Sequence, residues 1–478
     1  MEQYDLLTIY VFVVAISEIL GVLSAVQAIM QSRTSQGAIA WAVSLVLFPL
    51  FAVPLYWVFG SRKLHGCLDA RRAGDLHLAA IAEDMTQDSY AYRRSESVDE
   101  EPFHSIQKLT RFPFYAGNSV SLLIDGDQTF EAMFAAIEQA RSYIIVQTFI
   151  IRDDELGGRL RELLIRKARE GCHVYLLYDA FGSRNWSRKA INALEEAGAY
   201  VEAFAAAWTS VSRFQFNFRN HRKITIVDGK TAFVGGLNIG DEYLGRNAKF
   251  GPWRDTHVQL SGPAVQAVQL TFVEDWYWAT GTLPQLNWRM KPNSEGDYSI
   301  AVHSTGPADE LDTCTLFFVQ AINSAKDRVW IASPYFVPDE SVVTALQLAA
   351  LRGVDVRIML PQKPDHLLVY LSGFYYVDAI AGAGVKFFRY QQGFMHHKVL
   401  LVDDNLSAVG TVNLDNRSLH LNFEITLVFA GNEFAGSVAE MLARDFQHCH
   451  QTTPDDLRSR SYLFQVSVRI ARLFSPIQ

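Results

Sequence analysis

The sequence predicts an α/β fold in which two pseudo-twofold-related α/β-sandwich domains follow an N-terminal two-helix transmembrane hairpin. Three observations predict it. Two long apolar segments open the chain, helical segments then alternate with apolar strands, and one pattern of residues occurs twice, about 175 residues apart. The 478 residues, of which 49% are hydrophobic and 20% are charged, suffice for two or three domains with large buried cores.

The two apolar segments, residues 6–30 and 37–60, each exceed the roughly 20 residues that a membrane-spanning helix needs. Glu18 is the only charged residue of the first segment, and the second segment has none. The polar residues QSRTSQ between them predict a tight turn. A cleaved signal peptide is the weaker alternative, because the start MEQYD lacks basic residues and a second apolar segment follows at once.

The distribution of basic residues predicts an orientation. Arg62, Lys63, Arg71 and Arg72 follow the second segment, whereas the turn carries only Arg33 and no Lys or Arg precedes the first segment. Lys and Arg concentrate on the cytoplasmic side of membrane proteins. We therefore expect a multi-pass protein of the cytoplasmic membrane, with the N-terminus and everything after residue 60 in the cytoplasm.

An internal repeat follows a charged, irregular connector. The segment from Ala136, AIEQARSYIIVQTFII, matches the segment from Ala321, AINSAKDRVWIASPYF. Each is followed by an amphipathic helix that ends at a glycine, Gly171 or Gly353, and by an apolar strand. This alternation predicts α/β units around a largely parallel sheet. The expected divisions are a transmembrane hairpin (1–60), a connector (61–115), domain 1 (116–290), domain 2 (291–455) and an amphipathic tail (456–478).

The best-matched part of the repeat is polar. NHRKITIVDGKTAFVGGLN (220–238) aligns with MHHKVLLVDDNLSAVGTVN (395–413), which gives His-x-Lys, four residues, Asp, six residues and Gly-[Gly/Thr]-x-Asn in both halves. Because alternate residues of a strand face the same way, the His and Lys of each copy project together. Two such copies at matched spacing predict one shared cleft to which each half contributes a motif.

Two imidazoles, two ammonium groups and two carboxamides around one point suit a phosphodiester. Lysines and asparagines can neutralise its non-bridging oxygens, while one histidine attacks phosphorus and the other protonates the leaving alcohol. The aspartates of the motif lie one strand away from the histidines, so we expect them to brace the fold rather than touch a substrate. The predicted motif residues are His221, Lys223, Asp228, His396, Lys398 and Asp403 as the catalytic set, with Lys223, Asn238, Lys398 and Asn413 binding phosphate.

No metal or other cofactor is expected. The four cysteines are scattered without CxxC spacing, which is typical of reduced thiols rather than of a zinc site or disulfides. His397 is expected to point away from the site, and the HCH at 448–450 to lie in the core or on the surface. The net charge of −8 argues against nucleic acid as a partner.

The doubled motif resembles that of the phospholipase D superfamily. The whole chain, with two apolar segments before the motifs, is similar to the bacterial cardiolipin synthases of that superfamily, as is the segment KFGPWRDTHVQLSGPAVQAVQLTFVEDW (249–276). The resemblance implies an enzyme of the bacterial inner membrane that joins two phosphatidylglycerol molecules into cardiolipin and releases glycerol. It also implies a phosphatidyl-histidine intermediate, no metal, and contacts with membrane lipids.

The resemblance further implies roles for four residues. His221 corresponds to the nucleophile and His396 to the general acid and then base, although the pseudo-symmetry leaves the reverse assignment open. Members of the superfamily carry an acidic residue after each motif that orients the histidine of the opposite half. The matching residues are Glu424, expected to pair with His221, and Asp255, expected to pair with His396.

Other activities stay open on the sequence alone. A membrane-tethered phospholipase D would use water as acceptor and yield phosphatidic acid, and a related synthase would take its phosphatidyl group from phosphatidylethanolamine. The acidic balance and the apolar segments disfavour a nuclease. The tail, which mixes Arg469 and Arg472 with apolar residues, fits either an interfacial helix or a helix packed on the globular domain. The sequence does not indicate an oligomeric state.

Overall fold

The computed structural model describes residues 2–31, 34–60, 92, 102–110, 112–204, 217–293 and 296–478. The chain divides into two compact units, residues 1–69 with 206–219 and residues 70–205 with 220–478. Arg33, most of the connector and the basic residues after residue 60 lie outside the described residues. The predicted orientation therefore rests on the sequence.

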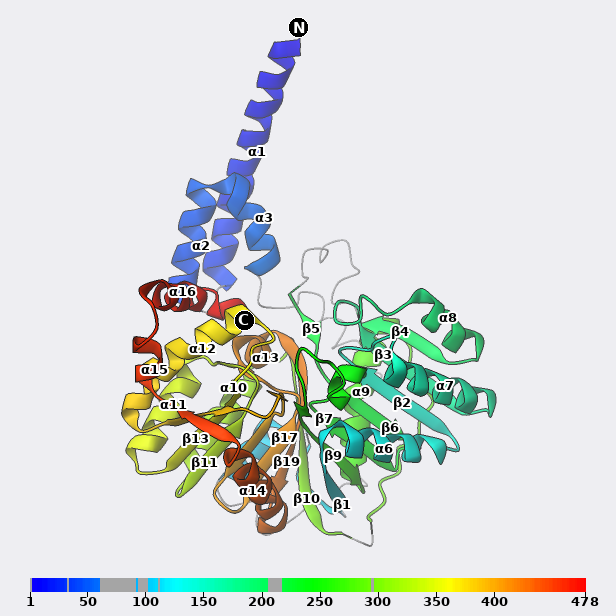
Figure 1. The fold of residues 1–478 in the computed structure, drawn as a ribbon. Coiled ribbons are helices and arrows are strands. Elements are labelled where there is room, and N and C mark those ends of the chain that lie inside the picture. Colours follow the sequence, from blue (N-terminus) through cyan, green and yellow to red (C-terminus); the bar gives the residue numbers. More distant parts are fainter. Residues whose placement is uncertain are drawn as a thin grey trace. The chain divides into compact units, whose positions relative to one another are not determined.

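Three helices form the described N-terminal part of the first unit: α1 (Glu2–Gln31), α2 (Ser35–Leu47) and α3 (Pro49–Phe59) (Figure 1). Among the described residues, only the Thr8–Gln31 stretch of α1 is both long and apolar enough to cross a membrane. The single helix predicted over 37–60 is instead two helices that meet at Phe48, where φ is −134° and ψ is 53°. Pro49 causes this break, because proline lacks an N–H donor and disfavours helical backbone in the preceding residue.

One continuous sheet runs through both halves of the second unit (Figure 1). In spatial order its strands are β20 (Cys449–Thr452), β14 (Lys386–Tyr390), β13 (Asp355–Pro361), β11 (Arg328–Ala332), β16 (Val399–Val402), β17 (Leu406–Gly410), β19 (Asn422–Ala430), β10 (Tyr298–Thr305), β1 (Tyr115–Ile124), β9 (Thr256–Ser261), β7 (Thr231–Gly235), β6 (Ile224–Val227), β2 (Tyr143–Thr148), β3 (His173–Asp179) and β4 (Tyr200–Phe204). The order is nearly palindromic about the antiparallel β10–β1 pair, as a pseudo-twofold relation between the halves requires.

The expectation of a largely parallel sheet is wrong. Within this sheet the parallel pairs are those of β2–β3–β4 in one half and β11–β13–β14 in the other, and the edge strand β20 is antiparallel to β14. The central pairs are antiparallel because each motif is built on a tight hairpin, β6–β7 or β16–β17, and strands joined by a short turn run in opposite directions.

Helices cover the sheet on both faces. The longest helix among the described residues of this unit, α9 (Ala264–Thr280), is buried along most of its length and ends at Gly281, whose φ of 70° suits glycine. The other helices are α5 (Phe103–Leu109), α6 (Asp125–Glu138), α7 (Glu155–Arg169), α8 (Arg188–Glu196), α10 (Thr313–Ser324), α11 (Glu340–Leu351), α12 (Leu367–Ile380), α13 (Asn416–His420), α14 (Asn432–Phe446), α15 (Pro454–Arg458) and α16 (Tyr462–Arg472).

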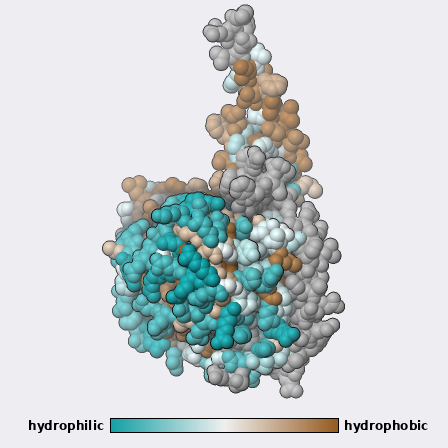
Figure 2. Space-filling view, turned by 90° about the vertical axis from the view of Figure 1, so that its right-hand side faces the viewer, coloured by the Kyte–Doolittle hydropathy of each residue, from teal (hydrophilic) through white to brown (hydrophobic). Residues whose placement is uncertain are grey.

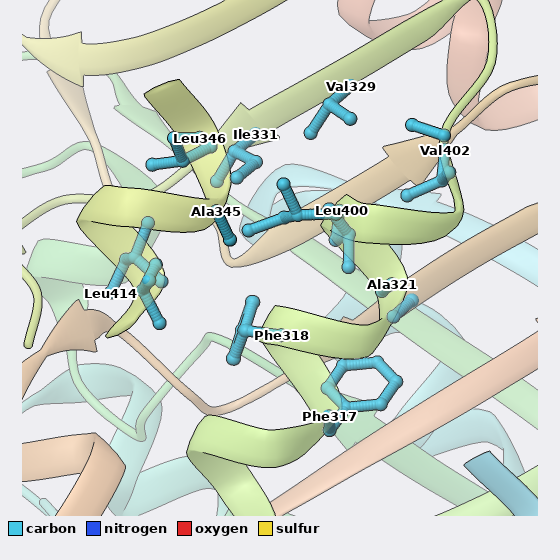
Figure 3. Packing of buried hydrophobic residues seen from close by; sticks show 14 of the residues in the cluster. Phe317, Phe318, Ala321, Val329, Ile331, Ala345, Leu346, Leu400, Val402 and Leu414 are labelled. Atoms are coloured by element: carbon cyan, nitrogen blue, oxygen red, sulfur yellow. The ribbon is translucent and has the colours of Figure 1, made fainter. Parts of the chain in front are cut away.

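Each half has its own hydrophobic core. In the second half, Phe317 and Phe318 of α10 pack against Ile331 of β11 and Leu400 of β16, with Leu346 of α11 closing the layer (Figure 3). Burying each such side chain contributes about 1.5–3 kcal/mol. These cores hold the ends of the motif strands in fixed positions.

The C-terminal tail is a helix with two different faces. Val468 of α16 is fully buried, and the Phe464 ring meets the Phe374 ring of α12 edge-on, with ring centres 5.4 Å apart. The Arg472 guanidinium lies 4.0 Å from the centre of the Tyr375 ring. The opposite face, with Leu463 and other large apolar side chains, is exposed. The tail therefore packs on the second half and keeps an apolar face outside.

Candidate active site

The two motif histidines are positioned by the opposite half of the molecule. The backbone N–H of His221 donates to the carbonyl of Phe423 at 2.9 Å, and that of His396 donates to the carbonyl of Arg254 at 2.8 Å. Next to the second contact, β15 (Phe394–Met395) pairs in parallel with β8 (Trp253–Arg254). Each accepting carbonyl immediately precedes one of the two acidic residues, so these backbone contacts bring each histidine beside a carboxylate.

Both histidine–carboxylate pairs are present. His221 Nδ1 lies 3.0 Å from each carboxylate oxygen of Glu424, and His396 Nδ1 lies 2.8 Å from Oδ2 of Asp255. Both carboxylates are fully buried. A carboxylate that accepts a hydrogen bond from the Nδ1–H fixes the tautomer, so that Nε2 carries the lone pair that can attack or accept a proton.

Glu424 is embedded in hydrogen-bond donors. Its oxygens accept from Thr411 Oγ1 at 2.6 Å, Ser418 Oγ at 2.7 Å and Asn422 Nδ2 at 3.1 Å. Burial raises its pKa, but His221, Lys223 and these donors outweigh burial and hold the pKa of Glu424 below its usual value. The carboxylate is therefore ionised and can stabilise positive charge on His221.

Asp255 has a poorer set of donors. It accepts from the Thr256 backbone N–H at 2.8 Å and from Trp253 Nε1 at 3.4 Å. Burial raises the pKa of Asp255 above its usual value, despite the nearby Lys398 charge. The two halves therefore match in geometry but differ in electrostatics.

The lysines lie against their own histidines. Lys223 Nζ donates to the His221 carbonyl at 2.6 Å, and Lys398 Nζ lies 3.0 Å from Nδ1 and 3.2 Å from Nε2 of His396. Burial lowers the pKa of Lys223 to about 7 and that of Lys398 to about 8, and each ammonium group also disfavours the charge of its neighbours.

Both imidazoles are neutral at neutral pH. Burial lowers the pKa of His221 to about 4, against the opposing effect of Glu424. Burial and the charge of Lys398 hold the pKa of His396 well below its usual value. A neutral imidazole is the form needed for nucleophilic attack, and an incoming anionic phosphodiester favours protonation of the other ring.

The motif asparagines are used differently in the two halves. Asn238 Oδ1 accepts from the Ile150 N–H at 3.2 Å, and its Nδ2 donates to Tyr243 Oη at 3.1 Å. In the described part of the chain, the buried Oδ1 of Asn413 has no hydrogen-bond partner. Asn238 therefore mainly connects the loops after β2 and β7. The sequence predicted only that it binds phosphate, and did not predict this structural role.

The motif aspartates do not lie with the histidines. Asp228, at φ 52°, accepts the backbone N–H groups of Ser142 at 2.7 Å and of Tyr143 at 3.0 Å, and Asp403, at φ 47°, does the same for Asp327 and Arg328. These contacts fix the starts of β2 and β11. These contacts match the expectation that the two aspartates brace the fold, and a direct part in catalysis for them stays a prediction.

Two of the motif glycines are in close contact with other atoms of the protein. A Cβ on Gly236 would lie 2.0 Å from Oδ1 of Asp255, and one on Gly410 would lie 2.3 Å from the Ile425 carbonyl. Close approach of the carboxylate to the motif loop therefore requires glycine at 236. In the second half Thr411 occupies the equivalent position and donates to Glu424 instead.

Several site residues were missed from the sequence. Thr411, Ser418 and Asn422 around Glu424 carry no spacing signal of their own. Arg222, between the two motif residues, pairs with Asp275 at 2.6 Å and donates from Nε to the Glu424 carbonyl at 3.0 Å. The position of Arg222 within the doubled motif can be read from the sequence. Its ion pair with Asp275 cannot, because the two residues are far apart in the sequence.

His397, the second-half counterpart of Arg222, faces away from the site into the protein. Its Nδ1 lies 3.2 Å from Thr256 Oγ1, and the ring is fully buried. This arrangement contributes to packing between the halves.

Comparisons with known proteins agree on one family. A family model described as "Cardiolipin synthase, PLD-like domain" matches residues 133–276 and 318–448. Cardiolipin synthase A of Pseudomonas putida (strain W619) is 47% identical over 473 residues, 98% of each chain. Cardiolipin synthase A of Pseudomonas aeruginosa (strain LESB58) is 48% identical over 465 residues, 96% of this chain and 94% of that one.

A solved structure shares the fold. The crystal structure of phosphatidylserine synthase from Haemophilus influenzae Rd KW20 superimposes with a TM-score of 0.61 at 15% identity, covering 78% of this chain and 99% of that one. Together with the family match, this likeness confirms the α/β part of the predicted fold class, the two related domains.

Proposed function

This chain belongs to the cardiolipin synthase family of the phospholipase D superfamily, and from that premise we propose that it transfers a phosphatidyl group from one phosphatidylglycerol to a second, giving cardiolipin and glycerol. It is a phosphatidyltransferase of the membrane. The observation that carries the mechanism is the reciprocal pairing of His221 with Glu424 and of His396 with Asp255 across the two halves.

In the first step, the Nε2 lone pair of His221 attacks the phosphorus of one phosphatidylglycerol. The bond from phosphorus to the headgroup glycerol oxygen breaks, and protonated His396 supplies the proton that glycerol needs to leave. The product of this step is a phosphatidyl group on His221 and a neutral His396.

In the second step, His396 removes the proton from a headgroup hydroxyl of a second phosphatidylglycerol. The resulting oxygen attacks the phosphatidyl-histidine, the bond from phosphorus to Nε2 breaks, and cardiolipin leaves. His396 is protonated again and His221 is neutral, so the cycle closes with no net change in the enzyme.

The electrostatic difference between the halves supports His221 as the nucleophile. A phosphatidylated imidazole carries positive charge, which the ionised and well-donated Glu424 stabilises. Lys398 beside His396 favours proton release, as a general acid requires. Lys223 and Lys398 provide positive charge for the phosphate oxygens as negative charge builds on them.

We place the catalytic halves on the cytoplasmic side of the membrane. Basic residues follow α3 in the sequence, and Lys and Arg concentrate on the cytoplasmic side of membrane proteins. Holding the site at the bilayer surface raises the effective concentration of a lipid substrate.

Trapping of the intermediate tests the assignment. Detergent-purified enzyme is mixed with phosphatidylglycerol labelled at its phosphorus, quenched in alkali and examined for labelled protein. We expect a labelled adduct with the natural enzyme and none with His221→Ala. His396→Ala should lose about 10²–10⁴ in turnover. A persistent adduct in His221→Ala would move the nucleophile elsewhere.

Product analysis tests the acceptor and donor. With phosphatidylglycerol alone in the presence of a chelator, we expect cardiolipin and glycerol in equal amounts. Phosphatidic acid without cardiolipin would identify a hydrolase. Cardiolipin only when phosphatidylethanolamine is added would keep the two-histidine chemistry and change the phosphatidyl donor.

A further inference from the structure

We propose that α2 and α3 form a re-entrant hairpin that contacts the lipids of one leaflet only. The chain then crosses the membrane once, through α1, and its N-terminus lies on the side opposite to residue 60. This topology differs from the two complete spans that the hydropathy of the sequence predicts. It builds on the membrane location of the proposed function, and its test is independent of catalysis.

Length is the first argument. The 13 residues of α2 and the 11 residues of α3 give helices of about 20 Å and about 16 Å, whereas a hydrocarbon core is about 30 Å thick. The Thr8–Gln31 stretch of α1, with 24 residues, reaches about 36 Å. Only α1 can reach across by itself.

The direction of α3 is the second argument. A Cβ on Gly21 of α1 would lie 2.4 Å from the Leu45 carbonyl and 2.8 Å from Cβ of Pro49, so the end of α2 sits at Gly21. If α3 continued in the direction of α2, Trp57 would lie about 18 Å beyond Leu45 along that axis. Instead Trp57 Nε1 donates to Ser24 Oγ at 3.2 Å, which is nearer to the C-terminal end of α1.

A contact between the short helices agrees with this return. Tyr56, near the end of α3, meets Trp41, in the middle of α2, with ring centres 5.2 Å apart. Helices that continued in one direction would separate these rings. Figure 1 shows α2 and α3 side by side along the C-terminal half of α1.

The surface of this unit has the chemistry of a lipid contact. The hairpin tip exposes Leu47, Phe48, Leu50 and Phe51, and α2 and α3 contain no charged residue. Side chains on the visible face of these helices are largely hydrophobic (Figure 2). A tip of this kind is costly in water and belongs in hydrocarbon, so the hairpin ends inside the bilayer rather than at its surface.

The basic residues fit the re-entrant topology better than two spans. Two spans place Arg33 outside, opposite to Arg62 and Lys63. A re-entrant hairpin puts all three on the cytoplasmic side and leaves outside only the N-terminal segment, which has Glu2 and Asp5 but no Lys or Arg. This distribution is the one that the positive-inside rule favours.

Cysteine accessibility in the full chain separates the two topologies. Cys67 and Cys449 are first replaced by serine, while Cys172 and Cys314, both buried, remain. Single variants Gln3→Cys, Ser35→Cys and Glu440→Cys are then treated in spheroplasts with a membrane-impermeant maleimide, before and after permeabilisation. Glu440 is exposed on α14 and reports the side of the catalytic halves.

The re-entrant hairpin predicts that Ser35→Cys reacts on the same side as Glu440→Cys and that Gln3→Cys reacts on the other side. Two complete spans predict the reverse for both positions. Reaction of all three variants on one side would mean that α1 does not cross, which also overturns the proposal. Cardiolipin production by each variant shows that it is folded, and loss of activity alone changes none of these readings.

Discussion

The lysines of the two motifs are the groups beside the histidines whose charge changes near neutral pH. With pKa values of about 7 for Lys223 and about 8 for Lys398, they are protonated below these values and neutral above them. Because both contribute the positive charge that holds the phosphodiester, the protonated forms are the active ones. The pKa values of both histidines lie below this range, so the need for a protonated His396 gives an even decline across it, and any steeper fall within it belongs to the lysines.

We therefore expect kcat/KM for phosphatidylglycerol to fall more steeply as pH rises through about 7 to 8, since this ratio reports the groups of the free enzyme. Lys223→Arg stays charged at every accessible pH, so its alkaline decline should move up toward the value set by Lys398, although the altered shape lowers the rate itself. The profile is measured in mixed micelles. An unchanged decline in Lys223→Arg would assign it to another group.

The different roles of the two histidines can be separated with a donor whose leaving group needs no proton. A phosphatidyl ester of p-nitrophenol releases an anion that is stable near neutral pH, so the first step no longer needs a general acid. His396→Ala and Asp255→Asn should then still release a burst of nitrophenol. His221→Ala should show none, and Glu424→Gln should lose about 10²–10⁴ of the burst rate, because an amide cannot stabilise the charged imidazole.

Ser418→Ala is the matched control, because it removes one hydrogen-bond donor to Glu424 and leaves the charge of Glu424 unchanged. This variant should keep most of the burst. The opposite pattern, with bursts in His221→Ala and none in His396→Ala, would exchange the roles of the two halves.

At the scale of elements, the aspartates of the motif act on strand ends rather than on substrate. Asp228→Ala removes a carboxylate that accepts several backbone N–H groups, and it places alanine at a left-handed φ. We expect a loss of about 1–3 kcal/mol in the free energy of unfolding, seen as a lower thermal midpoint in detergent, with kcat per folded molecule preserved.

Asp228→Asn is the control for this change, because asparagine tolerates a left-handed φ and keeps one acceptor oxygen. It should unfold between the natural enzyme and Asp228→Ala. A large drop in kcat without a lower midpoint would instead mean that Asp228 takes part in catalysis.

The repeat and the motif positions could be predicted because they are local signals. Alternation identified the strands that present His221 and His396, and the identities of both acidic partners came from resemblance to a family. The continuous sheet could not be predicted, because the β10–β1 pairing joins residues some 180 positions apart. The break at Phe48 could have been predicted, since Pro49 follows it. Average hydropathy does not show the break, because it takes no account of a missing hydrogen-bond donor.

At the scale of the whole molecule, the two halves form one site because each completes the other. Arg222 of the first half donates to the Glu424 and Thr305 carbonyls of the second and pairs with Asp275. In the second half, Asp445 pairs with Arg254 of the first at 2.7 Å. Buried ion pairs of this kind are costly to break, so the relative position of the two histidines is fixed within one chain.

This arrangement predicts that the two histidine variants do not complement each other. When His221→Ala and His396→Ala are produced together in cells that lack other cardiolipin synthases, every chain still lacks one of the two histidines of its own site. We therefore expect no cardiolipin in the lipid extract. Production of the natural enzyme together with either variant should give normal cardiolipin, which controls for expression. Restored cardiolipin in the doubly mutant cells would show that a site can be assembled from two chains, contrary to the pairing of His221 with Glu424 and of His396 with Asp255 within one molecule.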